Sequence, residues 1–375
     1  MEEWTIYRLG DVINVLDYMR VPLSSKQREF RKGNYPYYGA QGIIDYVDSF
    51  LFDGEYLLIA EDGENLKSKK QNIAQIARGR YWVNNHAHIV ESNGRCDIRY
   101  ICYLLNQIDL SGYITGSAQP KLNQANLLAI ELRLPCLEVQ KRVSDFLATF
   151  DDKIELNNRI NHNLEEQAQI VFDRIFNSDL TNNCLLSSIV DINPKRTLRK
   201  NEVARCIDMT YLNTAGSFPS GWEFKPYSGG MKFINGDTLM ARITPCLENG
   251  KVAYINFLDK EETAFGSTEY IVFHAKEGYP NEMFYFLTRN KAFIEFATKN
   301  MNGSSGRQRV SGETIGNYII PVLSEDDINE LKTVSESTMK EILKNNLESR
   351  VLSEMRNTIL PKLMSGELKI NDLTC

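Results

Sequence analysis

Residues Gly116 to Pro135 read GSAQPKLNQANLLAIELRLP, and residues Gly303 to Pro321 read GSSGRQRVSGETIGNYIIP. Both stretches begin with Gly-Ser, end in a segment with Leu or Ile that is closed by proline, and precede a long segment of helical periodicity. The second stretch follows the first by 187 residues, about half of the 375-residue chain. The repeat indicates a duplicated architecture, in which each of two similar globular units is followed by a long helix.

The composition is that of an ordinary soluble globular protein, with 42% hydrophobic and 25% charged residues. No apolar run approaches the roughly 20 residues of a membrane span. The amino terminus, MEEWTIYRLGD, lacks the basic and apolar regions of a secretory signal. The expected compartment is therefore the cytoplasm.

The cysteines are odd in number and form no CxxC pair, which argues against a disulfide framework and against a zinc site. We expect them to be reduced and mostly buried. They are Cys96, Cys102, Cys136, Cys184, Cys206, Cys246 and Cys375.

The net charge of −6 is unevenly distributed. Basic and acidic residues nearly balance in the two globular units, and the excess acid lies in the predicted helices at 138–176 and 323–375. A neutral unit can carry a basic face, so the total charge does not exclude DNA binding. It predicts modest affinity without a partner.

A heptad seam marks the first long helix, because apolar positions alternate spacings of four and three over about four and a half heptads. Asn157 and Asn161 interrupt it, and polar seam residues usually specify register and partner, so this helix is predicted to pair with one particular helix. An amphipathic core helix within a single domain is the alternative. The seam comprises Val143, Leu147, Phe150, Ile154, Asn157, Asn161, Leu164, Ala168, Val171 and Ile175.

The second helix is predicted to begin after Ser324, a good N-cap followed by acids. At a constant offset of 188 it repeats the middle of the first helix, including its Asn-Asn pair. Two such helices related by a pseudo-two-fold would lie antiparallel with facing asparagines. The residues predicted to pair the helices and hold partners are Ile154, Asn157, Asn161, Leu164, Ile342, Asn345, Leu352 and Ile359.

The globular units also match at an offset of 182, which pairs EYLLIA at Glu55 with DTLMAR at Asp237 and HIV at His88 with YIV at Tyr270. YICYLL at Tyr100 similarly matches FYFLT near Phe284. These apolar runs suggest strands separated by turns. We predict two similar α+β domains, 1–135 and 179–321, separated by two long antiparallel coiled-coil helices, 136–178 and 322–375.

Catalytic signatures are missing: there is no GxxxxGK[ST] loop, GxSxG elbow, GxGxxG turn or Asn-Pro-Pro-Tyr-like tetrapeptide. Glu61, Asp62 and Glu64 resemble a nuclease cluster, but Arg242 and Ile243 occupy the matching region of the second unit. Turn acids are the favoured interpretation.

His86 and His88 have the alternate spacing of strand-borne metal ligands. The second unit places Thr268 and Tyr270 there at the offset of 182, and no cysteine pair is nearby. We therefore predict no metal site.

Basic residues cluster near loop tyrosines in the first unit, and arginines with a glutamine follow the Gly-Ser turn in the second. Arg, Gln and Asn read base edges, whereas Lys holds phosphates. The predicted DNA-binding residues are Tyr38, Lys67, Lys69, Lys70, Arg78, Arg80, Gln119, Lys121, Arg242, Arg307, Gln308 and Arg309.

Taken together, these segments resemble the DNA-specificity subunits of type I restriction-modification systems. The resemblance rests on YPYYGAQGIIDYV, EDG at Glu61, WVNNHAHIV, GSAQPKLN, the proline-marked entry into the first long helix, and ILPKLMSGEL from Ile359 to Leu368. It covers essentially the whole chain in order and spacing.

The resemblance implies a non-catalytic subunit with two target-recognition domains, each of which reads half of a split DNA target, and with helices that act as a ruler. It also implies partners: modification subunits that methylate adenine with S-adenosylmethionine, and a restriction subunit that translocates and cuts, with ATP and Mg²⁺ bound by the partners. This chain itself would bind no cofactor.

The two units differ at most loop positions, so the expected target is asymmetric. The alternatives are the specificity subunit of a combined restriction-and-methylation enzyme, a self-contained nuclease or methyltransferase, and a coiled-coil scaffold without a nucleic-acid role.

Overall fold

The computed structural model describes residues 4–116, 119–177, 182–304 and 306–372. It contains two compact units, one formed by Met1–Asp152 with Ser353–Cys375 and the other by Lys153–Leu352. We call them unit 1 and unit 2. Each unit thus combines a globular α+β part with segments of both long helices.

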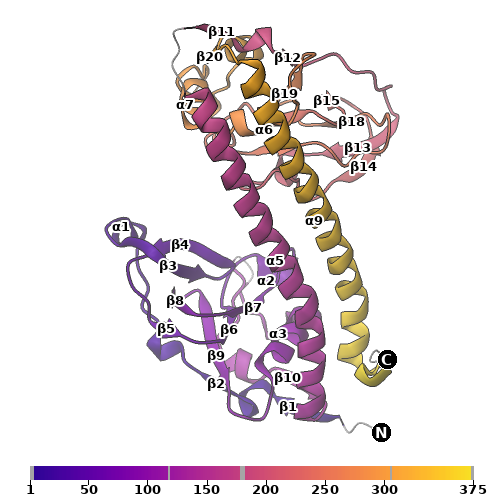
Figure 1. Ribbon diagram of the computed structural model, residues 1–375. Helices are drawn as coiled ribbons and strands as arrows, with labels where there is room; N and C mark the ends of the chain where they lie inside the picture. Colours follow the sequence, from indigo (N-terminus) through magenta and orange to yellow (C-terminus); the bar gives the residue numbers. More distant parts are fainter. Residues whose placement is uncertain (1–3, 117–118, 178–181, 305, 373–375) are drawn as a thin grey trace. The chain divides into compact units, whose positions relative to one another are not determined.

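Unit 1 contains short strands, short helices and the start of a long helix (Figure 1). Its strands are β1 (Thr5–Arg8), β2 (Ile13–Val15), β3 (Lys32–Gly39), β4 (Gly42–Val47), β5 (Phe52–Asp53), β6 (Tyr56–Ala60), β7 (Ala74–Ala77), β8 (Arg80–Val83), β9 (Ala87–Ser92) and β10 (Glu131–Leu134). Its short helices are α1 (Ser25–Glu29), α2 (Asn65–Ser68), α3 (Ile98–Gln107) and α4 (Gln124–Leu128).

Two four-stranded sheets form the centre of unit 1, in the orders β2-β9-β6-β7 and β4-β3-β8-β5, and β1 pairs with β10. Strand β6, YLLIA, is apolar throughout and almost entirely buried, as expected for a strand covered on both faces. The core adds α3 and residues of both long helices, including Leu147 and Leu360. The first sheet therefore packs with the helices around this core, whereas buried residues of the second sheet form two smaller clusters that include Phe52 and Tyr37.

Unit 2 repeats this inventory. Its strands are β11 (Asn183–Leu185), β12 (Val190–Ile192), β13 (Val203–Ile207), β14 (Glu223–Pro226), β15 (Lys232–Phe233), β16 (Thr238–Ala241), β17 (Val252–Tyr254), β18 (Ala264–Gly266), β19 (Tyr270–Ala275) and β20 (Ile319–Pro321). Its short helices are α6 (Met283–Leu287), α7 (Lys291–Lys299) and α8 (Gly312–Gly316).

Strand order is the same in both units, with every label of unit 2 shifted by ten: β12-β19-β16-β17, β14-β13-β18-β15 and β11-β20. Even the parallel pairing of β3 with β8 recurs between β13 and β18. The predicted α+β class and the duplication are confirmed.

The sequence offset of 182 between the units is wrong by one residue in two strands. The last ladder pairs are Ala60 with Ala87 and Ala241 with Tyr270. They precede equivalent hydrogen bonds, from the Glu61 amide to the His86 carbonyl and from the Arg242 amide to the Glu269 carbonyl. Strand β16 is thus offset by 181 from β6, and β19 by 183 from β9. A one-residue slip turns every side chain of a strand to its other face, so the slip matters for assigning equivalent residues.

The expectation that YICYLL and FYFLT form strands is also wrong. YICYLL lies in α3, where the Asp97 side chain accepts hydrogen bonds from the amides of Arg99 and Tyr100 as an N-cap. FYFLT lies in and just after α6, which is fully buried. Short apolar runs fit both a buried strand and a buried helix, and here the cap and tertiary packing decide.

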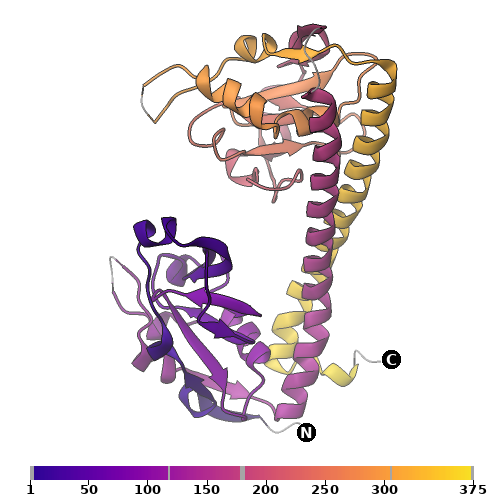
Figure 2. The same ribbon diagram turned by 60° about the vertical axis from the view of Figure 1, so that its left-hand side comes forward.

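The long helices are α5 (Leu137–Phe176) and α9 (Glu325–Ser365), which run side by side within each unit (Figures 1 and 2). Ser324 caps α9: its Oγ accepts from the amide of Asp327 at 3.1 Å, and the Asp327 carboxylate accepts from the Ser324 amide at 3.1 Å. The seam positions expected on α5 are buried or half-buried. The predicted antiparallel pairing is confirmed.

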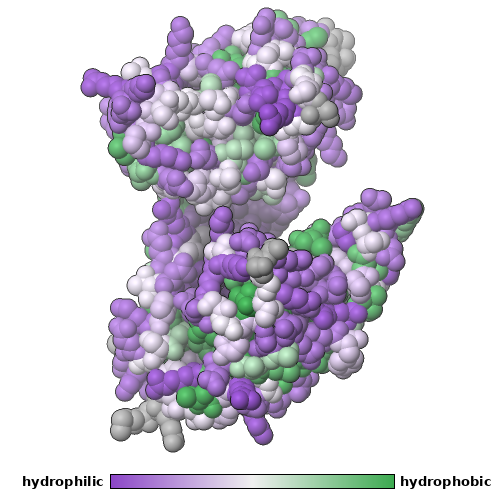
Figure 3. All heavy atoms as spheres, turned by 180° about the vertical axis from the view of Figure 1, so that it is seen from behind, coloured by the Kyte–Doolittle hydropathy of each residue, from purple (hydrophilic) through white to green (hydrophobic). Residues whose placement is uncertain are grey.

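No helix among the described residues is both long enough and apolar enough to cross a membrane. The face seen in Figure 3 is largely hydrophilic with scattered apolar patches. Among the cysteines, Cys96, Cys102 and Cys206 are buried, Cys184 and Cys246 are half-buried, and Cys136 is exposed; all six are free thiols. Cys375 lies outside the described residues.

Candidate nucleic-acid interface

A polar edge lies where β6 ends in unit 1. Lys121 forms isolated β-bridges with Thr115 and with Asp62, and the amide of Leu122 donates to the Glu61 carbonyl at 2.8 Å. These contacts fold the segment after Gly116 back onto the end of β6. We call residues 115–121 the first hairpin, of which 117 and 118 lie outside the described residues.

Unit 2 builds the same frame after β16. Arg309 bridges Asn302 and Ile243, and the amide of Val310 donates to the Arg242 carbonyl at 3.0 Å. We call residues 302–309 the second hairpin, of which 305 lies outside the described residues. Lys121 and Arg309 are therefore equivalent, as are Glu61 and Arg242.

The residue just before the neighbouring strand, β9 in unit 1 and β19 in unit 2, also contacts each edge. The amide of Glu61 donates to the His86 carbonyl at 2.9 Å, and the amide of Arg242 donates to the Glu269 carbonyl at 2.9 Å. Glu269, not Thr268, is thus the structural equivalent of His86, because of the strand slip. At both positions the equivalent residues differ in charge type: Glu61 corresponds to Arg242, and His86 corresponds to Glu269.

At the edge of unit 1, acidic and basic side chains pair with one another. Glu61 accepts from Arg20 at 2.7 Å and pairs with Lys121 at 3.1 Å, and Arg20 also pairs with Asp17 at 3.1 Å. Burial would raise the pKa of Glu61, but hydrogen bonds from Arg20 and Lys121 outweigh it and hold that pKa below its ordinary value. Glu61, Arg20 and Lys121 thus form one ion-pair network, which Arg20 extends to Asp17.

His88 belongs to this network as a structural residue. Its Nδ1 lies 2.6 Å from an Asp17 carboxylate oxygen and its Nε2 lies 2.7 Å from the Leu122 carbonyl. Asp17, Glu61 and His88 offer ligand atoms within 4.8 Å of one another, a spacing a metal ion could use. Arg20 already binds both acids and both ring nitrogens face acceptors, so this arrangement serves the ion network.

His86 takes a different position from His88. It is exposed and its Nδ1 lies 2.8 Å from a carboxylate oxygen of Asp62. The two histidines therefore do not converge on one site, despite their alternate spacing.

The edge of unit 2 is more cationic. Glu269 receives Arg309 through two guanidinium nitrogens, at 2.7 and 2.9 Å. These hydrogen bonds lower the pKa of Glu269, with help from the charges of Arg309 and Arg242. Arg309 also donates to the carbonyl of Arg307 at 3.0 Å, so each of its three guanidinium nitrogens has a hydrogen-bond partner.

Several polar side chains at these edges have no hydrogen-bond or ion-pair partner within the described part of the chain. They are Gln119 in unit 1 and Arg242, Arg307 and Gln308 in unit 2. Gln119 and Arg307 are exposed, and the other two are half-buried.

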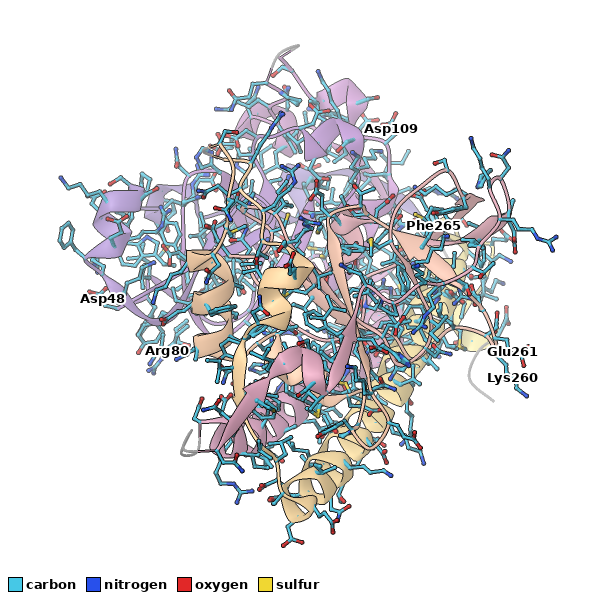
Figure 4. The ribbon with its side chains drawn as sticks, turned by 90° about the horizontal axis from the view of Figure 1, so that it is seen from above. Asp48, Arg80, Asp109, Lys260, Glu261 and Phe265 are labelled. Atoms are coloured by element: carbon cyan, nitrogen blue, oxygen red, sulfur yellow. The ribbon has the colours of Figure 1, made fainter. Side chains whose placement is uncertain are left out.

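The remaining basic residues predicted for DNA do not form one patch. Lys67 donates to the carbonyl of Gly116, in the first hairpin, at 3.1 Å. Lys69 pairs with Asp109 at 3.4 Å, and Lys70 is exposed beside it. Figure 4 shows Asp109 well separated from Arg80 within unit 1.

Arg80 and its neighbours belong to another part of unit 1. Arg80 pairs with Asp53 at 3.0 Å and lies over the Phe50 ring, and Arg78 pairs with Glu55 at 2.8 Å. Tyr38 packs edge-on against Tyr81. A DNA role for each of these residues stays a prediction.

Sequence reasoning missed Asp17, Arg20 and Glu269, which complete the two edges. They lie far along the chain from the hairpins, and no local pattern marks them. Only the positional match between Glu269 and His86, obtained with the correct strand offset, would have singled one out.

The helix seam of unit 2 is polar at its middle. Asn345 Nδ2 donates to Asn161 Oδ1 at 2.8 Å, and Asn157 Nδ2 donates to the Asn345 carbonyl at 3.3 Å and to Glu348 at 2.8 Å. Ile342 is buried beside these amides, and Ile154, Leu164 and Leu352 are half-buried, as is Ile359 in the helix segment of unit 1. Asn157, Asn161 and Asn345 are all buried, which ties the register of the helices to these hydrogen bonds.

Two α+β units of one topology, each with a polar hairpin edge, and a pair of long helices define a duplicated α+β protein. Residues 1–166 match the type I restriction modification DNA specificity domain. Residues 1–166 thus carry this specificity domain, and the chain as a whole is similar to the specificity subunits of type I restriction-modification systems.

Similar proteins include a putative type I restriction enzyme specificity subunit of Haemophilus influenzae, 35% identical over 37% of this chain and 35% of the relative. The matched segment thus spans about a third of that relative. The specificity subunit of the type I restriction enzyme MjaIX from Methanocaldococcus jannaschii is 21% identical over 99% of this chain and 95% of its own. The S subunit of a type I restriction-modification system from M. genitalium has the same fold, with a TM-score of 0.59 at 14% identity over 96% of each chain.

Proposed function

We propose that this chain binds a bipartite, asymmetric DNA target and directs adenine methylation and restriction by partner subunits. The observation that carries the proposal is the pair of equivalent hairpin edges, which keep one backbone frame but carry different side chains. Loops on a constant scaffold are where specificity is expected to vary.

The contrast between the edges supports unlike half-sites. In unit 1 the equivalent position is Glu61, neutralised by Arg20 and Lys121. In unit 2 it is Arg242, with Arg307 and Gln308 nearby on the second hairpin and Glu269 as the compensating acid among the described residues. Opposite local charge at matched positions favours different bases.

The chemistry is proposed to belong to the partners. We place S-adenosylmethionine on the modification subunits, and ATP and Mg²⁺ on the partner subunits. The task of this chain is then to position DNA. This leaves the chain itself as a non-catalytic specificity subunit.

An apolar surface on the helices of unit 2 suits a partner protein. Leu156 and Ile160 on α5 are 47% and 37% exposed, and Leu347 and Val351 on α9 are 44% and 55% exposed. Each pair is four residues apart and so forms one stripe on its helix, flanking the level of the buried asparagines. Exposed apolar stripes of this kind mark protein interfaces. We assign this surface to a modification subunit.

A pull-down with the modification subunit tests the assignment. Leu156→Glu combined with Val351→Glu should abolish co-purification, while Val203→Glu on β13, 64% exposed, should leave it intact. Retained assembly of the double variant would remove this surface from the proposal.

The helices are proposed to act as a ruler between the half-sites. With 40 residues, α5 is about 60 Å long at roughly 1.5 Å per residue. Inserting one heptad should lengthen the preferred DNA spacer. An unchanged spacer in the methylated target would contradict the ruler.

The whole proposal is tested by reconstituting the chain with its modification subunits and assaying a library of duplexes for methylation. We expect one split, asymmetric motif that disappears when this chain is omitted. Methylation or cleavage by the purified chain alone would instead support a self-contained enzyme. Assembly without any DNA preference would support a scaffold.

A further inference from the structure

Arg242 is held by its backbone at the edge of unit 2. It follows directly after β16, its amide donates to the Glu269 carbonyl at 2.9 Å, and its carbonyl accepts from Val310 at 3.0 Å. Its main chain is therefore fixed between the entry of β19 and the second hairpin.

The side chain of Arg242 has no partner within the described residues. Nε is buried and unpaired. The terminal Nη atoms also have no partner, yet they are not among the buried unpaired atoms, so solvent reaches them. The base of the guanidinium is enclosed while its two-nitrogen end is available to a ligand.

Neighbouring groups among the described residues do not accept hydrogen bonds from the two terminal nitrogens of the Arg242 guanidinium. Glu269 is the nearby acid, but its carboxylate already receives Nε and a terminal nitrogen of Arg309. In unit 1 the equivalent Glu61 is paired with Arg20 and Lys121. Only unit 2 therefore presents an unpaired, pre-positioned guanidinium at this place in the shared frame.

A planar fork of two donors fits the O6 and N7 acceptors that guanine shows in the major groove. We infer that Arg242 reads a guanine in the half-site bound by unit 2, and that unit 1 makes no equivalent contact. The inference rests on the proposed function. Arg309, clamped by Glu269 and by the Arg307 carbonyl, positions the hairpin beside Arg242 without reading a base.

A contact to a DNA phosphate is the competing role for Arg242. The two roles differ in what is lost when the guanidinium is removed. Loss of a base contact relaxes discrimination at one base pair, whereas loss of a phosphate contact weakens all sequences alike and lowers the salt slope by about one.

The experiment uses the complex of the full chain with its modification subunits and 30-mer duplexes built on its methylation motif. Each guanine of the motif is replaced in turn by 7-deazaguanine, which lacks the N7 acceptor. For the unchanged protein, one position in the unit 2 half-site should weaken binding about 10-fold or more. With Arg242→Ala, binding to the normal duplex should fall by a similar factor, and that position should become insensitive to the replacement.

Lys260→Ala is the matched control. Lys260 is an exposed cation of unit 2 in the loop after β17, labelled at the periphery in Figure 4. Because β17 runs antiparallel to β16, that loop leaves the sheet at the end away from Arg242. This variant should keep the sensitivity to 7-deazaguanine.

Each outcome decides the inference. A uniform loss across sequences with Arg242→Ala, with sensitivity to 7-deazaguanine retained, overturns it in favour of a phosphate contact. Unchanged binding overturns it altogether. If the unchanged complex has no preferred sequence, the proposed function fails, and this result is distinct from a failure of Arg242 alone.

Discussion

Asn345 donates a hydrogen bond from its side-chain amide to the Oδ1 of Asn161, 2.8 Å away, in the buried seam between α9 and α5. The two residues are 9% exposed or less. The amides cost stability relative to apolar seam residues, and they favour one register because any slip would leave them buried and unpaired.

Replacing Asn345 by Ala should destabilise the helix pair by about 1–3 kcal/mol, since the Oδ1 of Asn161 loses its donor. The urea midpoint followed by circular dichroism measures the change. Asn163→Ala, on the exposed side of α5, is the control and should leave the midpoint unchanged. Equal midpoints for the two variants would show that the amides contribute nothing to pairing.

Glu269→Gln should loosen the second hairpin at neutral pH by about 0.5–1 kcal/mol, a modest value because the pair with Arg309 is partly exposed. The folded pKa of Glu269 is depressed, so its contribution is present above its ordinary pKa of 4.5 and is lost as the pH falls through the lower folded value. The difference in urea midpoint between variant and unchanged protein should shrink below about pH 4.5. Glu295→Gln, from an exposed pair with Lys299, should show no such difference at any pH.

Ser324→Ala should lower stability by about 1 kcal/mol, because the first turn of α9 loses the acceptor for the Asp327 amide. Thermal unfolding monitored by circular dichroism checks this. Ser337→Ala removes an equally exposed hydroxyl from the interior of the same helix and should be nearly neutral. A neutral Ser324→Ala would mean that the acids after it satisfy the helix terminus alone.

Cysteine labelling should separate the interior from the surface. Burial raises the pKa of Cys102 and of Cys206 to about 12, so their reactive thiolate is scarce at pH 8. Cys136 is exposed and should be alkylated first by iodoacetamide, as read by peptide mass spectrometry. Fast labelling of Cys102 in the absence of denaturant would indicate that unit 1 opens readily.

Local periodicity was enough for the long helices. The seam from Val143 to Ile175 and the cap at Ser324 predicted both helices and their pairing, because a heptad repeat records one continuous contact along a helix. The short strands were harder. The turns that precede β9 and β19, Asn85-His86 and Thr268-Glu269, share no residue types that would align them, so the sequence matches His86 with Thr268 instead of Glu269.

The sequence by itself determined the duplication, the α+β class, the helix pair and its asparagines, since each of these leaves a repeat or a period in neighbouring residues. Only the tertiary structure decided which basic side chains form ion pairs within the protein and which remain unpaired among the described residues. Lys121 is neutralised by Glu61 and Arg309 by Glu269, while Arg242 keeps its fork unpaired. An ion pair depends on residues that approach through space from distant strands, and no spacing along the chain records that approach.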